Sequence, residues 1–147
     1  MIPKLTRLLP LSFAAVLTAC FGGAAAVPPR PLAAVLPDSS WKLASHDGSA
    51  VPSLITIRFD RDGSVSGLAI CNSFSGRARF SGQSILLSNM TQTLLGCELT
   101  GHGAAQKTVR ALLALERVPA RVTSAGLELT VAGRRLLLVQ QPQSPGK

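Results

Sequence analysis

The stretch LITIRFDRDGSVSGLAIC, residues 54–71, indicates the fold of this protein more clearly than any other part of the sequence. Apolar and polar residues alternate from Ile55 to Phe59, which is the period of a half-buried β-strand. Asp62-Gly63 then supplies the residues of a tight turn, and the alternation resumes from Val65 to Cys71. The stretch is therefore predicted to be a β-hairpin with one face in the core.

Further strands are indicated on both sides of one change of period. Residues 77–80 and 85–87 have the pattern of short strands, and residues 127–131 and 136–140 have the pattern of a closing hairpin. Residues 103–118 instead follow the helical period, with apolar side chains on one face: Ala105, Val109, Leu112 and Leu113.

Pro119 is expected to stop this helix, because proline cannot continue one. The order of strands, one helix and strands predicts an α+β fold. We expect a curled antiparallel β-sheet, small and barrel-like, packed around a single amphipathic helix.

The composition narrows the class of protein. The chain has 147 residues, which suits one domain, and 46% of them are apolar. Aromatic residues are only 4% and tyrosine is absent, which argues against a surface that stacks bases or sugars. The formal charge of +8, taken alone, suggests an anionic partner.

The N-terminus has the features of a secretory signal. Lys4 and Arg7 precede an apolar stretch, residues 8–17, that is too short to span a bilayer as a helix. The next residues, Leu17-Thr18-Ala19-Cys20, resemble the lipobox of bacterial lipoproteins. That resemblance implies removal of residues 1–19 and lipidation of Cys20. Ordinary cleavage after Ala24-Ala25-Ala26 is the alternative.

A lipid on Cys20 implies attachment to a membrane. Phe21 follows the cysteine where an aspartate would signal retention at the inner membrane, so we expect the bacterial outer membrane, facing the periplasm. Without lipidation the protein would be secreted into the periplasm. Loss of Lys4 and Arg7 lowers the formal charge from +8 to +6. Outside the cytoplasm an anionic lipid or lipopolysaccharide is a better partner than nucleic acid, although the basic residues can also simply solvate the surface.

The remaining chain divides by composition. Residues 20–38 are rich in alanine and proline, with prolines at 28, 29, 31 and 37, and are expected to form an extended, flexible tether. Residues 39–141 are expected to form the domain, and residues 142–147 a disordered tail.

Cys71 and Cys97 remain once Cys20 is assigned to lipidation. A pair of cysteines in an oxidising compartment predicts a disulfide. It would close a loop of about 27 residues and contribute roughly 3–4 kcal/mol. Two free thiols are the main alternative. A cysteine nucleophile would need His46 or His102 as its base. No metal site is expected, because no zinc-ligand spacing occurs.

Three pieces of sequence then resemble a known family. The first is Trp41-Lys42-Leu43, the second is Gly67 with the run from Cys71 to Gly76, CNSFSG, and the third is Met90, Thr93 and Cys97. In this order, and over about residues 39–140, they resemble the META domain of HslJ-type lipoproteins of bacterial envelopes. The chain departs from the pattern at Ile70, where the family usually has glycine.

The resemblance implies a small antiparallel sheet with a helix against it and a link to envelope stress, without an established catalytic activity or cofactor. The motif residues are expected to have structural roles. Asn72 would bond its own backbone in a turn, and Gly76 would give the chain freedom to re-enter a strand. Phe74 and Trp41 would fill the core, and Thr93 would bond backbone near Met90.

These observations favour a non-catalytic, lipid-anchored interaction module. An enzyme is disfavoured because no two carboxylates are placed for acid–base work, and Asp60 and Asp62 are expected to form a turn. The alternative is a small periplasmic protein that binds an amphiphile or an anionic envelope component. Its candidate contacts are five arginines on the predicted strands: Arg58, Arg77, Arg79, Arg134 and Arg135.

Overall fold

The structure, a computed structural model, describes residues 28–51, 54–96 and 103–142. Within these ranges the chain forms nine strands and two helices. In chain order they are α1 (Leu32–Val35), β1 (Ser39–His46), β2 (Ser49–Ala50), β3 (Ile55–Phe59), β4 (Ser64–Ala69), β5 (Asn72–Ser81), β6 (Ser84–Gln92), α2 (Gly103–Leu113), β7 (Arg117–Val122), β8 (Leu127–Val131) and β9 (Arg134–Gln141).

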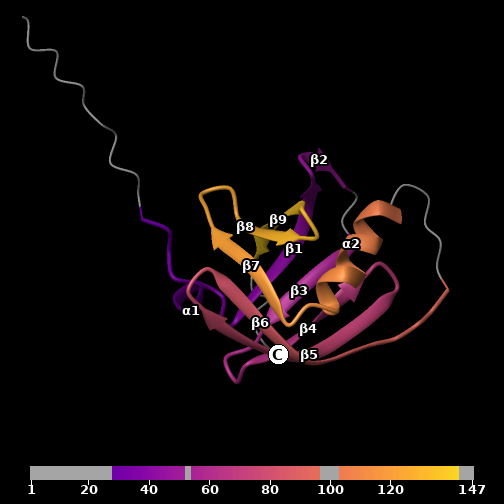
Figure 1. The fold of residues 1–147 in the computed structure, drawn as a ribbon, viewed down its shortest axis with the longest axis horizontal. Helices are drawn as coiled ribbons and strands as arrows, with labels where there is room; N and C mark the ends of the chain where they lie inside the picture. Colours follow the sequence, from indigo (N-terminus) through magenta and orange to yellow (C-terminus); the bar gives the residue numbers. More distant parts are fainter. Residues whose placement is uncertain (1–27, 52–53, 97–102, 143–147) are drawn as a thin grey trace, which may run out of the picture.

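Eight of the nine strands form a closed antiparallel barrel. They follow the order β1-β3-β4-β5-β6-β7-β8-β9, and β9 pairs again with β1 (Figure 1). The short strand β2 pairs with β1 alone, outside the ring. The predicted curled antiparallel sheet is therefore confirmed, and the predicted hairpin from Leu54 to Cys71 is β3 and β4.

A carboxylate fastens the closure of the barrel at one end. Arg135 is the second residue of β9. Its backbone N–H donates to Asp47 Oδ1 at 2.8 Å, and the Arg134 side chain donates to Asp47 Oδ2 at 2.8 Å. The Asp47 N–H donates in return to the Arg135 carbonyl at 2.8 Å. The hydrogen bond from the Arg135 backbone, followed by that from Arg134, holds the pKa of Asp47 below its usual value. Asp47 thus links the turn after β1 to the start of β9.

Side chains from the strands fill the barrel. The inward-facing residues alternate along each strand, as the period of two requires, and Trp41 and Phe74 are only 2% and 4% exposed. Both were predicted to lie in the core, and both predictions are confirmed. The enclosed space inside the barrel measures only about 10 Å³, which is about the room of one water molecule. The interior is a packed core.

The prediction of a barrel-like sheet packed around a single helix is confirmed only in part. The strands close on each other, and α2 lies beside them at the right of Figure 1. The apolar face of α2 joins the core, and His46 Nε2 of β1 contacts Thr108 Oγ1 of α2 at 2.9 Å. A second, shorter helix, α1, also belongs to the described chain.

The helix α2 is also shorter than predicted. It ends at Leu113, and residues 117–122 form β7, so Pro119 lies in a strand and does not terminate the helix. The buried residues of β7 are Val118, Ala120 and Val122, which alternate with exposed ones. This period of two begins soon after the helical pattern ends. The predicted helix, residues 103–118, therefore included the first residues of the strand.

The end of the tether is part of the fold, which corrects the expected boundary at Ser39. Residues 32–35 form one helical turn, and Leu32 and Leu36 are 1% and 0% exposed. Arg30 forms an antiparallel β-bridge with Val122 of β7. Residues 1–27 lie outside the described chain, and so do the predicted signal and Cys20.

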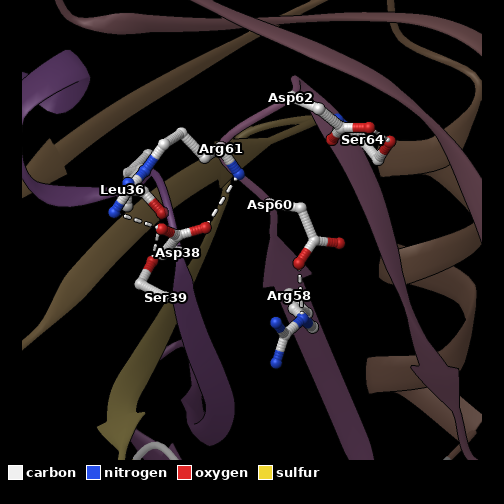
Figure 2. A network of polar contacts seen from close by, with 8 residues as sticks. All are labelled: Leu36, Asp38, Ser39, Arg58, Asp60, Arg61, Asp62 and Ser64. Carbon is white, nitrogen blue, oxygen red and sulfur yellow. Dashed lines mark hydrogen bonds and ion pairs between the residues drawn. The ribbon is translucent and has the colours of Figure 1, made fainter. Parts of the chain in front are cut away.

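Two turns are joined by a polar network where the tether enters β1 (Figure 2). Asp38 accepts a hydrogen bond from the Arg61 backbone at 2.9 Å and forms an ion pair with the Arg61 side chain at 2.6 Å. Ser39 Oγ donates to the Leu36 carbonyl, so both sides of Asp38 are held. The network ties the start of the domain to the β3–β4 turn.

The β3–β4 turn is built by aspartates, as predicted. Asp62 accepts from the backbone N–H and the hydroxyl of Ser64, each at 2.8 Å, and these bonds lower the pKa of Asp62 below its usual value. Asp60 forms an ion pair with Arg58 at 2.7 Å.

Gly67 of β4 is required by the ring that faces it. Its partner across the β4–β5 ladder is Phe74. A Cβ at Gly67 would lie 2.5 Å from Phe74 Cζ and would collide with the Thr56 carbonyl oxygen. Because Gly67 has no side chain, the buried phenyl ring of Phe74 can lie directly against the strand.

We predict that Gly67→Ala lowers the free energy of unfolding by about 2–3 kcal/mol, because the ring and the backbone of β3 must both move. Urea unfolding followed by the fluorescence of Trp41 measures the change. Gly103→Ala is the matched control, because among the described residues no atom outside its chain neighbours and its own helix backbone lies within 4 Å of the added Cβ, and alanine favours a helix. Equal stability of the two variants would contradict this role of Gly67.

Candidate functional site

The family motif gathers at the corner between β4 and β5. Ile70 occupies this corner with a φ of +70°, the left-handed region that glycine adopts most easily. A β-branched residue is rare there and costs about 1–2 kcal/mol. The Ile70 N–H donates to the Leu54 carbonyl at 2.9 Å, and the Ile70 side chain is buried. Ile70 thus adopts a backbone conformation that suits glycine, at the position where the family resemblance leads us to expect glycine.

Asn72 braces this corner by long-range hydrogen bonds. Its Oδ1 accepts from the backbone N–H of Leu95 at 2.6 Å, and its Nδ2 donates to the Leu95 carbonyl at 3.2 Å. Asn72 is 3% exposed, so these bonds are shielded from water. Asn72 was expected to bond its own turn; in the structure its side chain points inward at the start of β5 and meets the segment after β6.

Thr93 continues the same brace. Its Oγ1 accepts from the Ser73 backbone N–H at 3.1 Å and lies 3.2 Å from Asn72 Oδ1. The Thr93 N–H donates to the Ser73 carbonyl at 3.0 Å. The prediction that Thr93 bonds backbone is confirmed, and the β5–β6 ladder is extended beyond Gln92.

Cys71 lies next to this brace. Its Sγ is 4.0 Å from the Leu95 carbonyl oxygen, and Asn72 Nδ2 approaches it at 3.7 Å. Cys97 lies outside the described residues, so the predicted disulfide between them stays a prediction. In the described ranges, no group of three or more histidine, cysteine, aspartate or glutamate side chains could hold a metal ion.

The remaining motif residues pack the core. Gly76 lies in β5 at a bulge between Ser75 and Arg77. A Cβ at Gly76 would collide with Met90 Sδ and lie 3.0 Å from the Ser88 carbonyl oxygen. Gly76 therefore makes room for Met90, which corrects the expected role in backbone freedom. Trp41 lies apart from the corner in β1, where its Nε1 donates to Ser39 Oγ at 2.6 Å.

Four exposed leucines belong to the segments that meet at the braced corner, and the sequence analysis did not single them out. We call them the leucine surface: Leu54 (46% exposed), Leu68 (48%), Leu94 (79%) and Leu95 (58%). Leu68 is on β4 opposite Thr56, and Leu54 precedes β3 at the adjoining position. Asn72 fixes Leu95 directly. The sequence carried one signal for this surface, because the alternation of side chains along β4 places Leu68 on the outer face of the strand.

These features define a class: a small closed antiparallel β-barrel with a helix between β6 and β7 and a braced β4–β5 corner. The sequence matches the META domain model over residues 34–143, and the chain belongs to the META domain family. The motif of Gly67, Asn72, Phe74 and Gly76 lies within the matched range.

Two solved structures share the fold. A protein from Burkholderia xenovorans, determined by NMR, has a TM-score of 0.61 at 20% identity, covering 97% of this chain and 100% of its own. A second protein determined by NMR has a TM-score of 0.61 at 22% identity, covering 73% of this chain and 92% of its own. A search of curated proteins found no match. Neither helix of the described chain is long and apolar enough to cross a bilayer.

We predict that Asn72→Ala loosens the segment after β6 and lowers the free energy of unfolding by about 1–3 kcal/mol, because two shielded hydrogen bonds are lost. Hydrogen exchange of the Leu95 amide, observed by NMR, reports the local effect. Gln92→Ala removes an exposed amide side chain nearby and should leave that exchange unchanged. Unaltered protection of Leu95 in Asn72→Ala would contradict the brace.

Proposed function

We propose that this protein is a lipid-anchored bacterial cell-envelope protein whose META domain serves as a non-catalytic interaction module. The membrane anchor is supported by Leu17-Thr18-Ala19-Cys20, which matches a lipobox in sequence and in position. The outer membrane, facing the periplasm, is the proposed location. The resemblance to HslJ-type lipoproteins supports a role in envelope stress.

The leucine surface is the observation that carries the interaction module. Single exposed leucines are common, but a large exposed apolar patch marks a protein-binding site, and we propose that these four leucines together form one. Asn72 and Thr93 hold the backbone beneath it, so little conformational entropy is lost when a partner binds. We propose an envelope protein as that partner.

A disulfide between Cys71 and Cys97 is part of the proposal. Leu95 is two residues before Cys97 in the sequence, and its carbonyl oxygen lies 4.0 Å from Cys71 Sγ. The bond would brace the same corner covalently, beside the hydrogen bonds of Asn72.

Binding of an amphiphile is the second candidate, and the geometry favours it less. The space of about 10 Å³ in the barrel has no room for an acyl chain. Among the five arginines considered for an anionic ligand, Arg58, Arg77 and Arg134 form ion pairs with Asp60, Asp62 and Asp47. An anionic ligand would therefore have to bind the outer surface, at arginines that no carboxylate neutralises.

The anchor predicts a specific mass for the protein purified from its native membrane. We expect loss of residues 1–19, addition of fatty acid at Cys20, and two hydrogens fewer than the fully reduced chain. Intact-mass spectrometry before and after reduction measures all three. Cys20→Ser is the control and should abolish the lipid without altering the disulfide. An unlipidated chain that retains its first residues would contradict the anchor.

The leucine surface predicts a discrete contact in cells. A photoreactive amino acid at position 68 or 94 should give one crosslinked product with an envelope protein. Val139 on β9 is the matched control, because it is an exposed apolar residue (39%) on another strand. Identical products from position 139, or none from positions 68 and 94, would contradict the proposed interaction surface.

A further inference from the structure

Two adjoining hollows lie on the outside of the barrel along β7. One is lined by Arg30, Gln83, Arg121 and Val122, and the other by Gln83, Arg121, Glu128 and Arg135. Gln83 and Arg121 belong to both hollows, so the two form one continuous surface. We call its three arginines, Arg30, Arg121 and Arg135, the arginine face.

The arginine face has a net positive charge. Glu128 is the acidic side chain in it, and Arg121 neutralises that carboxylate with contacts of 2.8 Å and 2.7 Å. Arg30 and Arg135 are exposed, and no ion pair with either occurs in the described part of the chain. Two guanidinium groups are thus available to an anion from outside.

The chain enters the barrel at the same place. Arg30 forms its β-bridge with Val122, the last residue of β7, directly beside Arg121. Cys20 is ten residues before Arg30 in the sequence, a distance of at most about 36 Å when fully extended. If Cys20 carries lipid, as the proposed function holds, this face of the barrel is the one that the tether keeps near the head groups.

We infer that the arginine face is the membrane-facing side of the barrel and binds the phosphates of anionic phospholipids. Guanidinium groups suit this ligand, because they donate parallel hydrogen bonds to phosphate oxygens. Charge complementarity and the entry of the tether at the same surface select a lipid head group. The leucine surface comes from the residue before β3, from β4 and from the segment after β6, so it stays available to a protein partner.

A vesicle-binding experiment tests the arginine face separately from the anchor. The chain of residues 20–147 with Cys20→Ser contains the whole described fold and carries no lipid. Its co-sedimentation is measured with phosphatidylcholine vesicles and with vesicles containing phosphatidylglycerol. We expect binding to the anionic vesicles alone. Because one basic residue near such a surface is worth about fivefold in affinity, Arg30→Gln/Arg135→Gln should weaken binding about 25-fold.

Lys107→Gln/Arg110→Gln is the matched control, because it removes the same charge from exposed positions on α2. We expect this variant to bind almost as well as the parent chain. Equal losses in both double variants would show that net charge alone acts and would overturn the inference, as would equal binding to neutral vesicles. Far-ultraviolet circular dichroism verifies that each variant is folded. The mass measurement of the anchor is independent of this result.

Discussion

The pairing of β1 with β9 is the constraint on which the rest of the structure depends. These strands come from the two ends of the domain, and their ladder runs from Ser40 opposite Gln141 to His46 opposite Leu136. Without it the sheet would have two long open edges and an incomplete core. Asp47 fixes the end of the ladder through both its backbone and its carboxylate. Contacts so far apart in sequence form late and make folding of such a barrel slow.

The sequence predicted the local elements well, because hydrophobic periodicity is a local property. The hairpin from residue 54 to residue 71 and the hairpin of β8 and β9 were both identified from alternation. The start of α2 was also found. Its end was missed, because Val118 continues the apolar series while the period changes from helix to strand. The closure between β1 and β9 was not specified, because no local pattern encodes the register of distant strands.

The motif residues show a similar division. Burial of Trp41 and Phe74 followed from their size and hydrophobicity. The roles of Gly76 and Asn72 did not follow from residue type, since propensity suggested a turn for Asn72 and backbone freedom for Gly76. In the structure Gly76 makes room for Met90, and Asn72 binds a backbone segment 23 residues away. Such roles depend on which residues the fold brings together. The partner of the Asn72 side chain is the backbone of Leu95, whose apolar side chain gives no sign of this contact in the sequence.

The docked end of the tether has a mechanical consequence. The bridge of Arg30, the buried side chains of Leu32 and Leu36, and the ion pair of Asp38 with Arg61 follow one another along the chain before β1 begins. A force pulling on the N-terminal side therefore loads these contacts one after another, and the first strand of the barrel only afterwards. Residues 30–38 would therefore bear such a force before β1 does.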